Sequence, residues 1–454
     1  MNQARRLFEP NTVVLIGSSR IKQDVGMSSP QLFKNVIYNM RHFFKGTTYI
    51  LDTEGEVGCK TLEDLPETPD LAVTMLPADQ SARQSEACAE IGVKAVVAIT
   101  GGYKDHHRQK LRNLRKEYDI RILGPNTILG VINTANGLNT TFEKDLMPCQ
   151  GGISVIAQSG GVGACILDWA CYYGIGISKF VFTGDKIDVD DIDLLQYLKE
   201  DPETRVICTY LEGIGDGREF IRTAREVVKK KPLLALKGGT TKEAARRALS
   251  HTTSMVGSDA VFEAAFKKAG IIRVREIEEL LNAAIALAKQ PPLKGDNIAV
   301  VSNVGGPAIL AADAVIGNGL KLAQLSNKTK LEIERRYPGV DVLNPIDLVA
   351  DARAERYSVA LDNVLSDPNV DGVMVINMLK SCFFEQEDAD AIVAAAKRHP
   401  DKPLVDVPGG GEDFQIVHKA LGDTRVPIYN SPEKAAQALR VLRAYSKVLA
   451  RKAE

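Results

Sequence analysis

A histidine in a loop of small hydroxyl residues is the first candidate for chemistry in this sequence. His251 lies between Ser250 and Thr252, within the stretch Lys237–Asp259, which starts with a glycine pair and a basic, alanine-rich segment. Imidazole is nucleophilic and titrates near neutral pH, so an exposed histidine can accept and return a phosphoryl or acyl group. The alternative is an ordinary solvated histidine, and the rest of the chain must decide between the two.

A glycine-rich turn supplies a second candidate, an anion site. Val155–Ala157 reads as a buried strand, and the residues after it turn into a helix that begins near Ala164. Exposed backbone N–H groups and the helix dipole bind anions, and a serine adds a hydroxyl donor. A turn that only lets the helix pack closely on the strand is the alternative. The predicted phosphate-binding residues are Gln158, Ser159, Gly160 and Gly161.

A carboxylate follows another predicted strand, in the sequence Tyr210-Leu211-Glu212-Gly213. If the strands are parallel, this carboxylate lies at the same edge of the sheet as the glycine turn. There it can orient one imidazole nitrogen and leave the other as the nucleophile. We therefore predict His251 and Glu212 as the catalytic residues.

The sequence gives no metal-binding pattern. Asp185, Asp188 and Asp190 share one acidic loop, but one loop without further ligands is weak support for a cation site. The seven cysteines are scattered without a CxxC pair, which is typical of buried thiols in a reducing compartment. We predict no metal site in this chain.

The middle and last thirds of the chain repeat each other. Gly160-Gly161 match Gly305-Gly306, 145 positions later. Both copies read as strand, glycine turn, helix, strand, acidic loop, strand, helix, strand, which predicts two flavodoxin-like domains. Further matches follow at slowly growing offsets: Asp201-Pro202 with Asp367-Pro368, Lys231-Pro232-Leu233 with Lys402-Pro403-Leu404, and Gly238-Gly239 with Gly409-Gly410.

The repeat exposes an insertion around the histidine. The first copy takes 32 residues from Gly239 to its next strand at Ile271, and the second takes only 17 from Gly410 to Pro427. The extra length carries His251. Long loops on rigid scaffolds usually carry function, which favours the reactive histidine over the ordinary one.

The first third of the chain reads as a nucleotide-binding domain. A β-branched run at 12–16 opens into a glycine turn, and buried runs then alternate with amphipathic segments, which predicts a doubly wound sheet. The G-x-G-x-x-G fingerprint is absent, and Asp52 follows Gly17 by 35 residues, beyond the spacing of about 20 typical of NAD sites. A nucleotide-like ligand other than NAD is favoured over ordinary loop glycines. The candidate binding residues at the strand ends are Gly17, Ser18, Ser19, Arg20, Pro77, Ala78, Thr100, Gly101 and Asn126.

Length and composition limit the class of protein. A chain of 454 residues holds about three domains. Its net charge of −1 gives no reason to expect a nucleic acid or an anionic membrane as a partner. No apolar run is long enough to span a membrane, and no signal peptide opens the chain, so we expect a cytoplasmic protein.

Taken together, these stretches resemble the α subunit of ADP-forming acyl-CoA synthetases (acetate–CoA ligase, ADP-forming), a family related to succinyl-CoA synthetase. The resemblance covers nearly the whole chain in order. It is carried by Gly17-Ser18-Ser19, Asp70–Val73, Pro77-Ala78, Leu123–Asn126, Gln158–Gly161, Gly184–Asp190, Tyr210–Gly213, Ser250-His251-Thr252, Asn303–Pro307 and Asn344–Asp347.

The resemblance implies a fold and a division of labour. It implies an α/β protein with a Rossmann-like CoA-binding domain at 1–129, a flavodoxin-like ligase domain with a phosphohistidine loop at 130–290, and a second flavodoxin-like domain at 291–454. The family reaction converts acyl-CoA, ADP and phosphate to a carboxylic acid, ATP and CoA. By resemblance, acetyl-CoA is the substrate, His251 is the phosphorylated residue and Glu212 steadies it.

The resemblance also implies a partner. The chain contains no recognisable ATP-grasp domain, so a β subunit would supply the site for ADP or ATP and Mg²⁺, in an α2β2 hetero-oligomer. Two alternatives remain, a non-catalytic CoA-binding regulatory subunit and an NAD-dependent oxidoreductase. The sequence departs from the family at Asp52-Thr53, at Asp185 and at Thr253.

Overall fold

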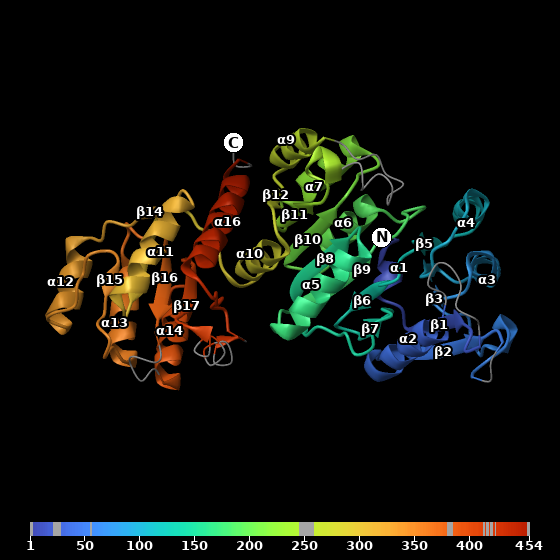
Figure 1. The fold of residues 1–454 in the computed structure, drawn as a ribbon, viewed down its shortest axis with the longest axis horizontal. Helices are drawn as coiled ribbons and strands as arrows, with labels where there is room; N and C mark the ends of the chain where they lie inside the picture. The colour runs from blue at the N-terminus through green and yellow to red at the C-terminus, as the bar shows by residue number, and fades with distance from the viewer. Residues whose placement is uncertain are drawn as a thin grey trace. The chain divides into compact units, whose positions relative to one another are not determined.

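In the computed structural model of this protein, the chain divides into two compact units, Met1–Ile277 and Glu278–Glu454. Figure 1 labels the helices and strands of both units. The predicted domain boundaries after residues 129 and 290 stay predictions. The structure describes residues 3–20, 29–54, 57–244, 258–378, 385–411, 414, 417, 421–422 and 424–451.

The first sheet has five parallel strands in the order β2-β1-β3-β4-β5. Apart from the first half of the edge strand β2, its strands are almost wholly buried, as expected of β-branched and alanine-rich runs covered by helices. The predicted strand at 12–16 is β1, and the predicted alternation of buried runs with amphipathic segments is present as β2 to β5 and α2 to α4. The elements are α1 (Arg5–Phe8), β1 (Thr12–Gly17), α2 (Pro30–Phe43), β2 (Thr47–Asp52), η1 (Leu62–Asp64), β3 (Leu71–Thr74), α3 (Ala78–Glu90), β4 (Ala95–Ala98), α4 (Asp105–Glu117) and β5 (Arg121–Leu123).

The second sheet has seven strands in the order β12-β11-β10-β8-β9-β6-β7. Helix α5 packs on β8 and β9, while α6, α7 and α9 pack side by side (Figure 1). An antiparallel ribbon, β6 with β7, extends the sheet at β9 and was not predicted. The elements are β6 (Val131–Asn133), β7 (Leu138–Asn139), β8 (Gln150–Ala157), α5 (Gly160–Tyr172), β9 (Ile177–Phe182), α6 (Asp191–Glu200), β10 (Val206–Leu211), α7 (Gly217–Val227), β11 (Leu233–Lys237), α9 (Asp259–Ala269) and β12 (Ile272–Val274).

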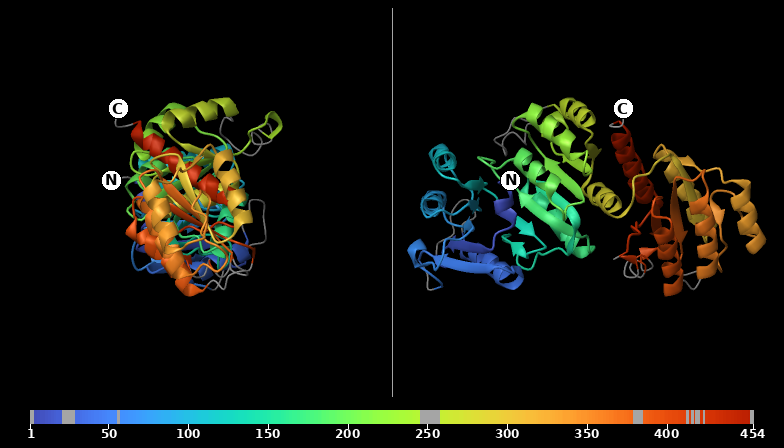
Figure 2. Two further views of the ribbon diagram at one scale, coloured as in Figure 1. Left: turned by 90° about the vertical axis from the view of Figure 1, so that its left-hand side faces the viewer. Right: turned by 180° about the vertical axis from the view of Figure 1, so that it is seen from behind.

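The third sheet lies in the second unit, with the order β14-β13-β16-β17 and with β15 paired to β13. Two apolar clusters cover its faces, one built with α13 and α14 and the other with α11 and α16. Figure 2 shows the sheets from two further directions. The elements are α10 (Ile277–Lys289), β13 (Asn297–Ser302), α11 (Gly305–Gly317), β14 (Lys321–Leu322), α12 (Asn327–Arg336), β15 (Ile346–Asp347), α13 (Ala354–Ser366), β16 (Gly372–Asn377), α14 (Gln386–Arg398), β17 (Leu404–Pro408) and α16 (Pro432–Ala450).

The internal repeat is visible element by element. Helices α5 and α11 have the same length and begin 145 residues apart, β10 and β16 begin 166 apart, and β11 and β17 begin 171 apart. The strand order β11-β10-β8-β9 of the first copy corresponds to β17-β16-β13-β14 of the second. The isolated bridge between Asp406 and Ile428 occupies the place of β12. Residues of these matched strands and helices can therefore be compared between the two copies.

This topology fixes where ligands bind. In the first sheet β1 lies between β2 and β3, and in the second β8 lies between β9 and β10. After β1, and again after β8, the chain therefore adds a strand on one side and then one on the other. Ligands of such sheets bind at the carboxyl ends of the strands, where the direction changes. That point lies between β1 and β3 in the first sheet and between β8 and β10 in the second. Within the described residues, no helix is long and apolar enough to cross a membrane.

Candidate active site

The carboxyl ends of three adjacent strands form the candidate site. β8 ends at Ala157, β10 at Leu211 and β11 at Lys237, and the three strands are parallel neighbours. Gln158 and Glu212 each follow directly after one of these strands. The topology therefore brings the predicted turn and the predicted carboxylate together at the point where the sheet changes direction.

Helix α5 begins at the same edge. The hydroxyl oxygen of Ser159 caps the helix and accepts a hydrogen bond from the backbone nitrogen of Val162 at 3.4 Å. A Cβ on Gly160 would lie 3.3 Å from the ring of Phe182, whereas a Cβ on Gly161 would have nothing within 4 Å. Packing therefore does not require glycine at 161. The open first turn of this 13-residue helix favours an anion through its N–H groups and its dipole.

The side chain of Gln158 ties β8 to the turn after β10. Its Oε1 atom accepts hydrogen bonds from the backbone nitrogens of Glu212 at 2.8 Å and Gly213 at 3.0 Å. Its Nε2 atom donates to the Gly213 carbonyl oxygen and to both carboxylate oxygens of Asp191, each at 2.9 Å. In the structure the Gln158 side chain thus holds the Glu212–Gly213 peptide in place. The predicted contact of Gln158 with phosphate stays a prediction.

A buried ion pair supports the same turn. The ammonium of Lys186 lies 3.0 Å from Asp191 and donates to the Gly213 carbonyl oxygen at 3.1 Å. The side chains of Lys186 and Asp191 are 11 % and 4 % exposed. Sequence reasoning did not assign roles to these two residues. A signal was present in the sequence, since Lys186 interrupts a run of acidic residues. In the structure its backbone is left-handed, with φ of 52°.

The carboxylate of Glu212 has a neighbour on its own strand. The Tyr210 hydroxyl donates a hydrogen bond to Glu212 Oε1 at 3.3 Å. Burial, and then the negative charge of Glu212, raise the pKa of Tyr210 to about 12, so the hydroxyl stays a donor at neutral pH. The absence of a side chain at Gly238 leaves space for the Tyr210 hydroxyl, because a Cβ there would lie 2.3 Å from its oxygen.

The predicted nucleophile, His251, lies outside the described residues, within 245–257. The described parts on either side are Gly238-Gly239, after β11, and the start of α9. Arg273 of β12 anchors α9 through ion pairs with Asp259 at 2.5 Å and with Glu263 at 2.7 Å. The described residues before this segment therefore leave the sheet beside Glu212, and those after it begin an anchored helix.

The acidic loop joins the two sheets of the first unit. Asp185 pairs with Arg108 at 2.8 Å, Asp188 pairs with Arg121 at 2.9 Å, and Asp190 caps α6. Each carboxylate thus has a structural partner. In the part of the chain that the structure describes, no group of three or more His, Cys, Asp and Glu side chains is arranged to hold a metal ion.

The predicted cofactor-binding residues follow β1, β3, β4 and β5 of the first sheet. Gly17 ends β1 where a Cβ would lie 2.4 Å from the ring of Phe33, and Asp52 accepts a hydrogen bond from the Ser19 nitrogen at 3.1 Å. Pro77 caps α3, whose first residue is Ala78. The other predicted residues, Ser18, Arg20, Thr100, Gly101 and Asn126, follow the ends of β1, β4 and β5.

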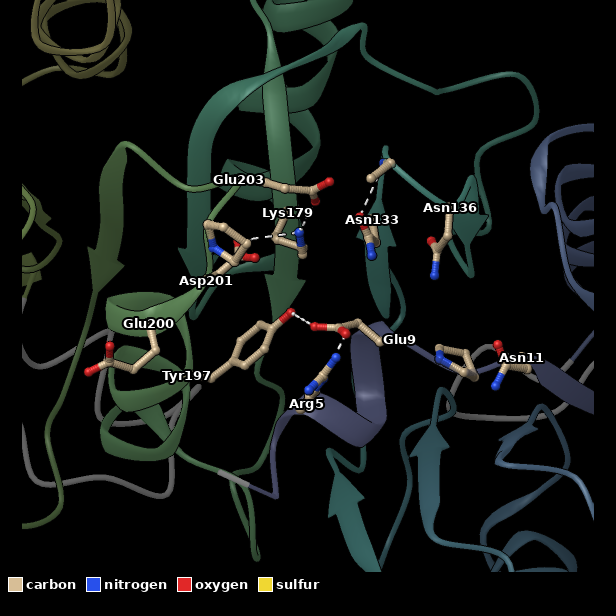
Figure 3. Close-up of a pocket in the computed structure, with 13 residues that line it drawn as sticks. Arg5, Glu9, Asn11, Asn133, Asn136, Lys179, Tyr197, Glu200, Asp201 and Glu203 are labelled. Carbon is tan, nitrogen blue, oxygen red and sulfur yellow. Dashed lines mark hydrogen bonds and ion pairs between the residues drawn. The ribbon is translucent and has the colours of Figure 1, made fainter. Parts of the chain in front are cut away.

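A separate cavity lies at the opposite, amino-terminal edge of these strands. It has a volume of about 920 Å³ and includes residues just before β1 and β10. Lys179, 2 % exposed, points toward Asp201 at 3.3 Å and Glu203 at 2.6 Å (Figure 3). The Tyr197 hydroxyl donates to Glu9 at 2.9 Å. The charged side chains named here are therefore paired within the chain, with the one ammonium of Lys179 facing two carboxylates.

Comparison with known proteins places the chain in a family. The family model described as "Succinyl-CoA ligase like flavodoxin domain" matches residues 150–287. The chain is 34 % identical over 458 residues to the acetate–CoA ligase [ADP-forming] I subunit alpha of Pyrococcus furiosus, covering 97 % of each chain. It is 35 % identical over 450 residues to the acetate–CoA ligase [ADP-forming] of Methanocaldococcus jannaschii, covering 96 % of this chain and 62 % of that one.

A solved structure is similar to this chain over its whole length. The dinucleotide forming acetyl-coenzyme A synthetase 1 of Ca. Korarchaeum cryptofilum, in complex with phosphate and ADP, is 31 % identical in sequence. The match covers 100 % of both chains with a TM-score of 0.88. The chain belongs to the family of ADP-forming acetate–CoA ligases, as their α subunit.

Proposed function

We propose that the chain carries a phosphoryl group on His251 and interconverts acetyl-CoA, ADP and phosphate with acetate, ATP and CoA. The observation that supports this most strongly is the carboxylate of Glu212. Gln158 fixes its backbone at the edge of the sheet where α5 begins and where the segment with His251 leaves β11. An oriented carboxylate beside an anion-favouring helix start is the arrangement that a phosphorylated histidine requires.

The first step uses CoA bound at the switch point of the first sheet. An oxygen of inorganic phosphate attacks the thioester carbonyl carbon, the C–S bond breaks and CoA leaves as its thiolate. The product is an acyl phosphate. The open start of α5, capped by Ser159, is suited to hold the phosphate during this step because its N–H groups point at the incoming oxygens.

The second step moves the phosphoryl group to the protein. An imidazole nitrogen of His251 attacks phosphorus, an N–P bond forms, and the P–O bond to the acyl group breaks, releasing the carboxylate. Glu212 accepts a hydrogen bond from the other ring nitrogen and keeps the correct tautomer. Two steps through a covalent intermediate replace one difficult exchange.

The third step requires a partner. An ADP oxygen attacks phosphorus, the N–P bond breaks and ATP leaves with histidine restored. We place ADP and Mg²⁺ on an ATP-grasp β subunit in an α2β2 assembly. Two observations support a partner, the name "subunit alpha" of the Pyrococcus relatives and the additional length of the M. jannaschii relative. The ADP and phosphate in the Korarchaeum structure support the ligands.

Labelling tests this proposal. The α chain with its β partner is incubated with ³²P-phosphate and acetyl-CoA, and acid-labile, base-stable label on the α chain is counted. We expect label in the wild-type protein and none in His251→Asn. A wild-type chain that binds CoA but takes up no label from either phosphate or ATP would instead be a regulatory subunit.

A further inference from the structure

Comparing the two copies of the repeat shows which lysines both copies share and which lysine only the first copy has. Lys231 precedes β11, and its ammonium donates to the Leu198 carbonyl oxygen at 2.6 Å and also to the carbonyl oxygen of Asp201. Its equivalent, Lys402, precedes β17 and donates to the Asp367 carbonyl oxygen at 2.6 Å. Asp201 and Asp367 are equivalent too. A lysine at the amino end of this strand is thus part of the fold in both copies.

The lysine at the other end of the strand is not repeated. Lys237 is the last residue of β11, and the last residue of β17 is Pro408. The neighbouring position shows the same pattern, since Glu212 after β10 is equivalent to Met378 after β16. The copy that carries the histidine segment therefore has two opposite charges at strand ends where its sister has two uncharged residues.

Lys237 is buried without a close counter-ion. It is 5 % exposed, its ammonium donates to the neighbouring carbonyl oxygen of Gly238, and it lies 4.7 Å from the centre of the Phe262 ring in α9. Among the residues that the structure describes, no carboxylate oxygen lies within 4.0 Å of this ammonium.

The charges around Lys237 do not bring the pKa of its ammonium back to the ordinary value for lysine. Burial lowers the pKa of Lys237, the carboxylates of Asp259 on α9 and Glu212 after β10 oppose this effect, and Arg273 on β12 adds to it. A buried ammonium without an ion partner lowers the stability of the fold, and such groups concentrate at functional sites.

We propose that Lys237 is a further catalytic residue, whose ammonium binds the oxygens of the phosphoryl group that the His251 segment carries. The inference rests on the proposed phosphoryl transfer and names the cation that balances its charge. Lys237 ends β11, the last strand before the segment, and Phe262 lies on α9, the first helix after it. The contact is an ion pair in which lysine keeps its proton, and it stabilises the negative charge on the oxygens while the bonds to phosphorus change.

Stability and activity should move in opposite directions when this charge is removed. In Lys237→Met within the assembled enzyme, we expect labelling of His251 from ³²P-phosphate and acetyl-CoA to fall about 100-fold. We expect the Tm of the isolated chain to stay the same or rise, because an uncompensated buried charge is gone. A residue that merely packs against Phe262 would instead lower the Tm when replaced.

Lys231→Met is the matched control, just before the start of the strand that Lys237 ends. It removes a lysine that bonds to two carbonyl oxygens, so the Tm should fall while the labelling rate of the folded protein stays at the wild-type value. Lys237→Arg should restore most of the labelling. It should also retain labelling at alkaline pH where the wild type loses it, because arginine does not deprotonate there.

Two results would overturn the inference. One is wild-type labelling in Lys237→Met, and the other is a loss of labelling that only follows a lowered Tm. Failure of the proposed function looks different, because the wild-type enzyme itself would then take up no label on His251.

Discussion

The Oε1 atom of Gln158 lies 2.8 Å from the backbone nitrogen of Glu212. The sister copy repeats this clamp, since Asn303 accepts from the Met378 nitrogen at 3.0 Å and donates to its carbonyl oxygen at 3.2 Å. An amide that spans two strand ends is therefore a property of the fold. Only the first copy uses it to hold a carboxylate.

Replacing Gln158 by leucine should loosen the turn. The substitution leaves the N–H groups of Glu212 and Gly213 without their acceptor and removes one of the donors to Asp191, so we expect a loss of about 3 kcal/mol in the free energy of unfolding. Denaturant unfolding of the whole chain measures it. Asn303→Leu should cost a similar amount in the second unit, while His251 labelling should fall only in Gln158→Leu. Unchanged labelling there would show that the clamp does not position Glu212.

Replacing Glu212 by glutamine should separate charge from shape. The amide oxygen can still accept the Tyr210 hydrogen bond, so the free energy of unfolding should change by less than about 1 kcal/mol. Labelling of His251 should fall roughly 100-fold, because the histidine loses the carboxylate that orients it and offsets its charge. Rapid-quench labelling with ³²P-phosphate gives the rate. A wild-type rate would remove Glu212 from the mechanism.

Gly238 and Tyr210 should behave as a coupled pair. In Gly238→Ala the new Cβ would lie 2.3 Å from the Tyr210 hydroxyl oxygen and 2.9 Å from its ring, so the ring must move away from residue 238. We expect a cost of about 1–3 kcal/mol from this overpacking. Tyr210→Phe removes the clashing oxygen, so the double variant should recover at least part of that cost. A double-mutant cycle by thermal unfolding checks this, and strictly additive effects would contradict it.

Elements with a strong local pattern could be predicted from the sequence. The five strands of the first sheet were readable because each is a short buried run, and the repeat because its glycine pairs and Lys-Pro-Leu strand starts recur. The ribbon of β6 and β7 was missed, since strands of three and two residues carry no periodicity.

The hydrogen bonds that hold the site residues in place could not be predicted from the sequence, for a different reason. The contacts of Gln158 with Asp191 and with Gly213 join residues 33 and 55 positions apart. Such pairs depend on which side chains meet beneath the strand ends. Asp185 illustrates the difficulty, because it looked like a candidate cation ligand in an acidic loop, and the structure pairs it with Arg108, 77 positions away.

The second unit contains a buried acid that should make its stability depend on pH. Asp406 is fully buried, accepts one hydrogen bond from Asn377 at 2.7 Å and has its other carboxylate oxygen without a partner. Burial raises the pKa of Asp406 to about 7, whereas the unfolded chain titrates near 4. The folded unit therefore binds this proton more tightly, and stability falls as the pH rises from about 4 to about 7. At about 1.4 kcal/mol per pKa unit, the loss is at most roughly 4 kcal/mol.

The variant Asp406→Asn tests this pH dependence because it removes the titrating group. Urea unfolding at pH 5 and pH 8 should show a smaller difference in the free energy of unfolding in the variant than in the wild type. Equal differences would mean that the Asp406 carboxylate ionises in the folded protein as easily as in the unfolded chain.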